Sequence, residues 1–167
     1  MAKMFLALNG DKVGEKISQA VLSNDPEQVR NLSASFNQAH TNIDQWVEKS
    51  GGRVIMASGD EAVYELDSEK MQELESILSD YAQTTGHTIT AGVGADILQS
   101  VKAMVYGKMH DAGQIIEYSE ELDQHLTPNQ ESQVEEIAED AGEEMDDSEM
   151  TEDDLMDTDS EGDEMSE

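Results

Sequence analysis

The stretch that decides the fold is RVIMASGDEAVYEL, residues 53–66. Two strand-like runs flank its four-residue turn, Ser58–Glu61, and Gly and Asp are common turn residues, so the stretch predicts a short β-hairpin. The tip carries two adjacent carboxylates, Asp60 and Glu61, and like charges side by side repel each other. Acidic residues often serve only to form a turn, but this adjacent pair also indicates a cation site.

A second acidic turn lies upstream, where the apolar run that ends at Leu8 is followed by Asn9 and Asp11. If this run is a strand beside the hairpin, the Asn9 amide oxygen meets the carboxylates of Asp11, Asp60 and Glu61 at one edge of the sheet. Carboxylate and amide oxygens are the ligands that hard divalent cations prefer. The two turns together therefore predict a site for Mg²⁺ or Mn²⁺.

Hydrophobic spacing and turn residues give the order of elements along the first 118 residues. A strand is followed by two helices, the hairpin, a helix, a strand, a helix and a last strand, or βααββαβαβ. This order predicts an α+β fold of the ferredoxin-like, or split βαβ, kind, with a mainly antiparallel sheet and helices on one face. The predicted strands are 4–8, 53–57, 62–66, 87–93 and 114–118, and the predicted helices are 12–22, 25–50, 68–86 and 97–109.

Charge divides the chain into a predicted domain, 1–118, and an acidic segment, 119–167. All nine Lys and Arg lie at or before Lys108, whereas 22 of the 39 acids lie in 119–167. A segment so charged and without aromatic residues buries little apolar surface, so we expect it to be a largely disordered tail. Such a polyanion suits a basic protein partner.

One part of this tail has a helical pattern. Apolar residues recur at spacings of three and four and predict a short amphipathic helix over 130–145. Two alternatives stay open, a helix that forms only on a partner and a fraying acidic helix. The apolar positions are Val134, Ile137, Ala138, Ala141 and Met145.

Composition also excludes several classes of protein. The chain has no cysteine, so disulfides and thiolate chemistry are excluded. Its longest apolar run is too short to span a bilayer, and no signal segment opens the chain, so we expect a cytoplasmic protein, or one in the host cytoplasm or virion if it is viral, for example from a phage. The formal net charge of -30 argues against binding duplex nucleic acid, which needs clustered Lys and Arg.

Four short motifs in sequence order carry a family resemblance. The chain resembles the nucleotide-cyclase palm superfamily, which includes GGDEF diguanylate cyclases and the polymerase subunit of type III CRISPR complexes. Within it, residues 3–118 are most similar to the minimal CRISPR polymerase family. The motifs are Asn9-Gly10-Asp11, Ser58-Gly59-Asp60-Glu61, Thr90-Ala91-Gly92-Val93-Gly94 and Tyr106-Gly107-Lys108.

The resemblance implies a two-metal site for nucleotidyl transfer. In such palms two divalent ions hold a nucleoside triphosphate, activate a ribose hydroxyl and steady the leaving pyrophosphate. Asp60 and Glu61 match the hairpin acids, Asn9 stands where the family places its first metal-binding Asp, and Asp11 takes the neighbouring acidic position. The implied product is a cyclic or oligonucleotide signal, and joining two nucleotides suggests a homodimer.

The resemblance also implies where the phosphates bind. Backbone amides of Gly10, Asp11, Lys12 and Val13, at the start of a predicted helix, would receive the triphosphate. Lys108 is the expected phosphate lysine, and the Lys12 side chain is a second candidate.

Two functions stay open because Asn9 is neutral and one anionic metal ligand is missing. The first is an enzyme, with Asp11, Asp60 and Glu61 as catalytic residues. The second is a degenerate palm that binds nucleotide or acts as a scaffold through its acidic tail, for example in a viral head core.

Overall fold

The computed structural model describes residues 2–149 of the chain. Five strands within this range form one sheet in the order β2-β3-β1-β4-β5. Neighbouring strands are antiparallel, except that β4 and β5 run parallel. The strands are β1 (Lys3–Gly10), β2 (Arg53–Ser58), β3 (Glu61–Asp67), β4 (Ile89–Gly94) and β5 (Ile115–Glu117).

The helices stand in the predicted order, and the α+β class with a mainly antiparallel sheet is confirmed. Asp25 caps α2, because its carboxylate accepts a hydrogen bond from the amide of Gln28. The predicted helix from Ser68 begins as a 3₁₀ turn, η1 (Ser68–Glu73). The others are α1 (Val13–Leu22), α2 (Pro26–Lys49), α3 (Leu74–Thr85), α4 (Ile97–His110), α5 (Glu120–Asp123) and α6 (Pro128–Glu149).

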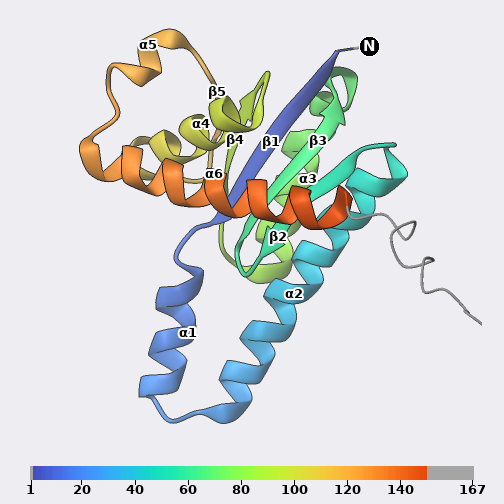
Figure 1. The fold of residues 1–167 in the computed structure, drawn as a ribbon. Helices are drawn as coiled ribbons and strands as arrows, with labels where there is room; N and C mark the ends of the chain where they lie inside the picture. Colours follow the sequence, from blue (N-terminus) through green and yellow to red (C-terminus); the bar gives the residue numbers. More distant parts are fainter. Residues whose placement is uncertain (1, 150–167) are drawn as a thin grey trace, which may run out of the picture.

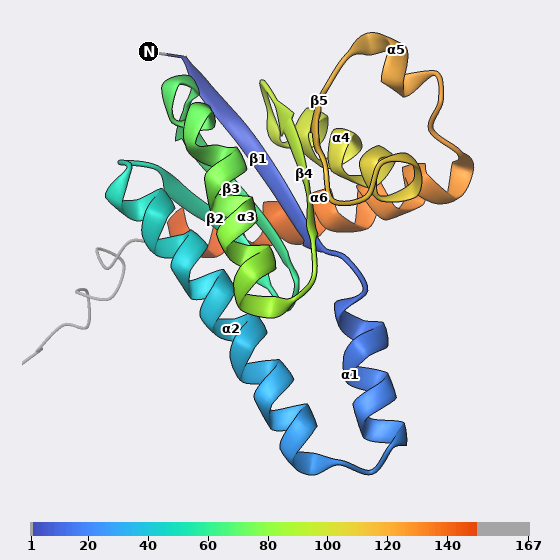
Figure 2. The same ribbon diagram turned by 180° about the vertical axis from the view of Figure 1, so that it is seen from behind.

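Helices cover both faces of the sheet, which corrects the expectation of helices on one face. In Figure 1 α6 crosses in front of the strands, and in Figure 2, seen from behind, α2 and α3 lie in front of them. The reason lies in β1, where Leu6, Ala7 and Leu8 are all fully buried. A strand with apolar residues on both sides needs cover on both sides. Leu6 and Leu8 pack with α2 and α3, and Ala7 packs with α4 and α6.

The acidic segment does not begin as a disordered tail. The helix predicted over 130–145 exists, extends over Pro128–Glu149 and packs on β2 and α4. Its residues Val134, Ile137 and Ala141 are buried in the core of that face, so residues 119–143 belong to the same folded unit as the sheet. The rest of the predicted tail, 150–167, lies outside the described residues. No helix within 2–149 combines the length and apolar character needed to cross a membrane.

Close packing of α4 on β4 brings the end of α4 to the end of β1. A Cβ atom at Gly92 would lie 2.1 Å from the Ser100 carbonyl oxygen and 2.3 Å from the Met104 nitrogen. Only glycine lets the two backbones approach this closely. The last turn of α4, which carries Lys108, is thereby held against the sheet.

Candidate functional site

The end of β1 is fixed by its two neighbouring strands. Asn9 pairs with Glu61 of β3 on one side and with Thr90 of β4 on the other. The Gly10 amide then donates to the Asp60 carbonyl at 3.0 Å, and the Asp11 amide donates to the Thr88 carbonyl at 2.9 Å. These bonds place the turn at the end of β1, Asn9-Gly10-Asp11, beside the hairpin tip, as the sequence predicts. We call it the strand-one turn.

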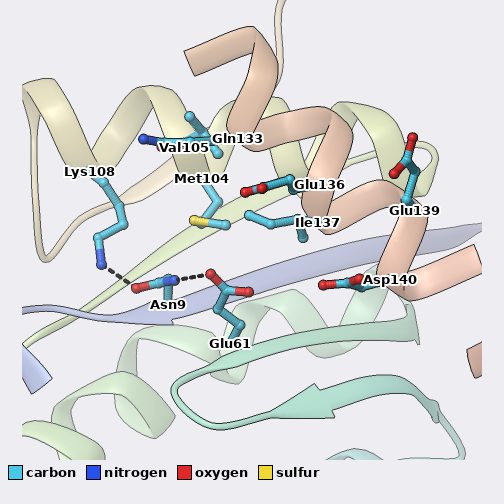
Figure 3. A pocket seen from close by; sticks show the side chains of 10 residues that line it. All are labelled: Asn9, Glu61, Met104, Val105, Lys108, Gln133, Glu136, Ile137, Glu139 and Asp140. Carbon is cyan, nitrogen blue, oxygen red and sulfur yellow. Dashed lines mark hydrogen bonds between the residues drawn. The ribbon is translucent and has the colours of Figure 1, made fainter. Parts of the chain in front are cut away.

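Lys108 reaches this turn from α4. Its Nζ donates to Asn9 Oδ1 and to the Gly10 carbonyl oxygen, the latter at 2.9 Å, and lies 3.7 Å from Asp11 Oδ1. Figure 3 shows the side chain extended toward Asn9. The ammonium therefore lies among oxygens of three consecutive residues, Asn9, Gly10 and Asp11.

Asn9 links Lys108 to the hairpin acid Glu61. The Asn9 side chain is almost buried, and its Nδ2 donates to Glu61 Oε1 at 3.0 Å. Burial raises the pKa of the Glu61 carboxyl, the nearby carboxylates of Asp60, Asp140 and Glu136 raise it further, and Lys108 opposes them. Both ends of the Asn9 amide are thus engaged, one by a cation and one by a carboxylate.

Asp11 is buried and hydrogen-bonded on both oxygens. Thr88 Oγ1 donates to one oxygen at 2.7 Å, and Thr90 Oγ1 donates to the other at 2.8 Å. Neither threonine is among the site residues predicted from the sequence. Their signal was their spacing of two on a predicted strand, which puts both hydroxyls on one face beside the strand-one turn.

The second hairpin acid, Asp60, lies beside this cluster at the hairpin tip. Asp60 lies in the two-residue turn between β2 and β3, and Glu61 is the first residue of β3. The Asp60 carboxylate acts on His40 of α2 and Tyr81 of α3, since it raises the pKa of both. Asp11 also raises the pKa of Tyr81, so Asp11 and Asp60 both lie near this hydroxyl, whereas Glu61 is bound by Asn9. The described residues hold no group of three acids arranged as metal ligands.

The predicted phosphate-binding residues are engaged in different ways. The amides of Gly10 and Asp11 are engaged by carbonyl oxygens, and the Val13 side chain is buried in the core. Lys12 adopts a left-handed φ of 59° and lines a separate surface hollow with residues of α1 and His87. Of the predicted set, Lys108 contacts Asn9 directly, and Gly10 and Asp11 both contact Lys108.

The site opens into a cavity of about 360 Å³, the site cavity, between the sheet and α6 (Figure 3). Palm residues form one wall and α6 forms the other. The side chains of α6 in this wall were not predicted as site residues, because the sequence alone did not show where α6 packs. The lining residues are Asn9, Glu61, Met104, Val105, Lys108, Gln133, Glu136, Ile137, Glu139 and Asp140.

The donors at the strand-one turn fit a divalent ion poorly. Asn9 supplies a neutral amide whose oxygen accepts from Lys108, and the Asp11 oxygens accept from two threonines. Within residues 2–149 there is no group of three or more His, Cys, Asp or Glu side chains arranged to hold a metal ion. The positive charge at this turn is the Lys108 ammonium.

A buried polar pair lies under the hairpin, on the face opposite the site cavity. Tyr81 and His40 stack edge to face, with ring centroids 5.6 Å apart, and the Tyr81 hydroxyl and His40 Nε2 have no hydrogen-bond partner among the described residues. Burial raises the pKa of Tyr81 and lowers that of His40, whereas the carboxylates of Asp44 and Asp60 raise the latter.

We expect His40 to make stability depend on pH. Its folded pKa lies below the ordinary value of 6.5, so the unfolded chain binds the proton more readily. The contribution of neutral His40 is complete above pH 6.5 and is lost as the pH falls from 6.5 through the lowered folded pKa. Denaturant unfolding at several pH values should show this slope in the parent, and His40→Phe should remove it.

The matched control is His125→Phe, since His125 is exposed. This variant should keep the slope of the parent. An unchanged slope in His40→Phe would contradict the assignment to His40.

Comparison with known proteins identifies a family. A family model described as the minimal CRISPR polymerase domain matches residues 5–119. No curated protein matches the chain. The matched range ends before α5 and α6, so the wall of the site cavity formed by α6 lies outside it.

Proposed function

Because the chain belongs to the minimal CRISPR polymerase family, we propose that it is a palm that binds nucleoside triphosphate, with Lys108 in place of a divalent metal ion. The family is one of polymerase-like nucleotidyltransferases, which supports a nucleotide as the ligand. The observation that carries the proposal is the contact of one ammonium with oxygens of Asn9 and Gly10. Nucleotidyl transfer is then slow or absent.

The chemistry of the ammonium supports a role in phosphate binding. A Lys ammonium has three donors, and two of them are used by Asn9 and Gly10. The third can reach a phosphate oxygen at the wall of the site cavity that the sheet and α4 form, which includes Lys108. Lys108 would hold the phosphate by charge and hydrogen bonding, without the activation of a ribose hydroxyl that a metal ion supplies.

The alternative is an active nucleotidyltransferase with the two-metal site that the sequence predicts. What favours it is that Asp11 and Glu61 lie on either side of Asn9, close to the end of β1. The prediction of Mg²⁺ or Mn²⁺ stays a prediction, and so do the homodimer and the basic partner.

A product assay separates the two functions. The parent protein is incubated with each of the four ribonucleoside triphosphates and Mg²⁺ or Mn²⁺, and pyrophosphate is measured. Binding without pyrophosphate is the result expected for the proposed function. Pyrophosphate from the parent, lost in Asp60→Asn or Glu61→Gln, would establish the enzyme instead.

The substitution Asn9→Asp tests the role of the neutral amide. It replaces the 3.0 Å donor to Glu61 with a second carboxylate, so we expect a loss of about 2 kcal/mol in the free energy of unfolding in EDTA. Millimolar Mg²⁺ should restore most of this loss, because the new pair of carboxylates then has a divalent counter-ion.

Unfolding of the parent and Asn9→Asp is measured in EDTA, in Mg²⁺ and in NaCl of matched ionic strength. The parent should respond equally to the two salts. A variant that Mg²⁺ stabilises no more than NaCl does would contradict this role of Asn9.

A further inference from the structure

Helix α6 lies over the site that the family fold provides. It crosses the sheet on the side of Asn9 and Glu61 and closes the site cavity (Figures 1 and 3). It also lies outside the residues that match the family. Helix α6 therefore adds a wall to the site cavity that the matched domain, residues 5–119, does not contain.

The helix is held firmly at its beginning and weakly at its end. Thr127 and Gln130 exchange hydrogen bonds, since the Thr127 amide donates to Gln130 Oε1 at 2.7 Å and the Gln130 amide donates to Thr127 Oγ1 at 3.3 Å. Val134, Ile137 and Ala141 are then buried against the sheet and α4. The last turn has no basic residue, and acids at a helix C-terminus oppose the helix dipole.

The wall that α6 presents to the site cavity repels phosphate. Its acidic lining residues are Glu136, Glu139 and Asp140, and Glu61 faces them from the palm. The only cationic lining residue is Lys108. Glu136 and Asp140 lie close enough to raise the pKa of Glu61. A triphosphate would meet these carboxylates while α6 is packed, and burying like charges together is unfavourable.

We propose that α6 is an autoinhibitory lid, so that α6 packing and nucleoside triphosphate binding at Lys108 exclude each other. This inference rests on the proposed function and adds its regulation. The apparent affinity for nucleotide is the intrinsic affinity reduced by the fraction of molecules with α6 released. Anything that stabilises packed α6 weakens binding, and anything that loosens α6 strengthens binding.

Two substitutions outside the site cavity change the stability of α6 in opposite directions. A Cβ atom at Gly142 meets nothing within 4 Å, so Gly142→Ala improves the helix without a new contact. Glu135 is exposed and does not line the cavity, so Glu135→Gly weakens the helix alone. Each substitution should alter the equilibrium between packed and released α6 about fivefold.

The experiment measures calorimetric binding of each ribonucleoside triphosphate to the full chain and its variants. Hydrogen exchange of the α6 amides is followed in parallel. We expect affinity to rise about fivefold in Glu135→Gly and to fall about fivefold in Gly142→Ala. The control is Glu75→Gly, the same substitution at an exposed position of α3, which should leave the affinity of the parent unchanged.

Failure of the lid and failure of the proposed function give different results. Equal affinities in all variants, with α6 exchange faster in Glu135→Gly and slower in Gly142→Ala, would overturn the lid while the proposed function stands. Absence of nucleotide binding in the parent and in Glu135→Gly, with faster α6 exchange in that variant, would overturn the proposed function and the lid with it.

Discussion

Lys108→Met is expected to lower the free energy of unfolding by about 3 kcal/mol, because it removes the cation from a buried anion. The Asp11 side chain is 9% exposed, and its nearest ammonium is that of Lys108, 3.7 Å away. The same substitution leaves the Asn9 and Gly10 oxygens without their donor. Methionine keeps an unbranched apolar stem as long as that of lysine up to Cε, so the loss reports the charge and its hydrogen bonds.

The chain offers a matched control on the same helix. Lys102 pairs with Asp123 at 2.9 Å, and its side chain is 25% exposed, against 29% for Lys108. The two lysines differ in their partners, since the Asp123 side chain is 35% exposed. We therefore expect Lys102→Met to cost about 0.5 kcal/mol. Free energies of unfolding are measured with denaturant. Equal losses in the two variants would contradict the role of Lys108 as the cation of the buried strand-one turn.

Gly92→Ala is expected to destabilise the fold by about 4 kcal/mol, since its Cβ would overlap backbone atoms of α4. A flexible side chain could move aside, but the Ser100 carbonyl and the Met104 amide belong to a helix that packs along the whole of β4. Any shift of α4 away from β4 also withdraws Lys108 from Asn9. We therefore expect loss of nucleotide binding together with the loss of stability.

Gly14→Ala is the control for this substitution. Gly14 lies in α1, and a Cβ there meets nothing within 4 Å, so alanine should leave stability equal or slightly higher. Thermal unfolding of the two variants provides the comparison. A melting temperature of Gly92→Ala equal to that of the parent would show that α4 does not depend on this close approach.

Much of the fold could be predicted because local patterns and tertiary packing agree. The hairpin turn at Ser58–Glu61, the cap at Asp25 and the apolar spacing of α2 each indicate the element that forms. It was harder to predict that helices, α4 and α6, also cover the second face of the sheet. The signal for this cover was the run Leu6-Ala7-Leu8, which is apolar on both sides of the strand, but the sequence does not say which helix covers Ala7.

The start of the acidic segment was expected to be disordered because its high charge was given more weight than three buried apolar residues of α6. High charge favours disorder in general. Val134, Ile137 and Ala141 nevertheless face an apolar surface made by Ala7, Met56 and other residues distant in sequence, and burial there stabilises the helix. The helical spacing was visible in the sequence, whereas the surface that receives it exists only in the folded chain.

The candidate site was half predictable for a similar reason. The meeting of Asn9, Asp11 and Glu61 follows from pairing the first strand with the hairpin, and Lys108 was recognised as a site residue. The different neighbours of Asp60 and Glu61 arise because Asp60 lies in the turn, whereas Glu61 begins β3 and pairs with Asn9. The Thr88 and Thr90 hydroxyls required knowledge that β4 lies beside β1.

The central claim is that the cation at the end of β1 is the Lys108 ammonium. The most direct test is calorimetric binding of the ribonucleoside triphosphates to the parent chain in EDTA and again in Mg²⁺ at matched ionic strength. We expect binding in EDTA, with an affinity in Mg²⁺ that differs by no more than about twofold, and loss of binding in Lys108→Met. Binding that occurs only with Mg²⁺, and that survives Lys108→Met, would contradict the central claim.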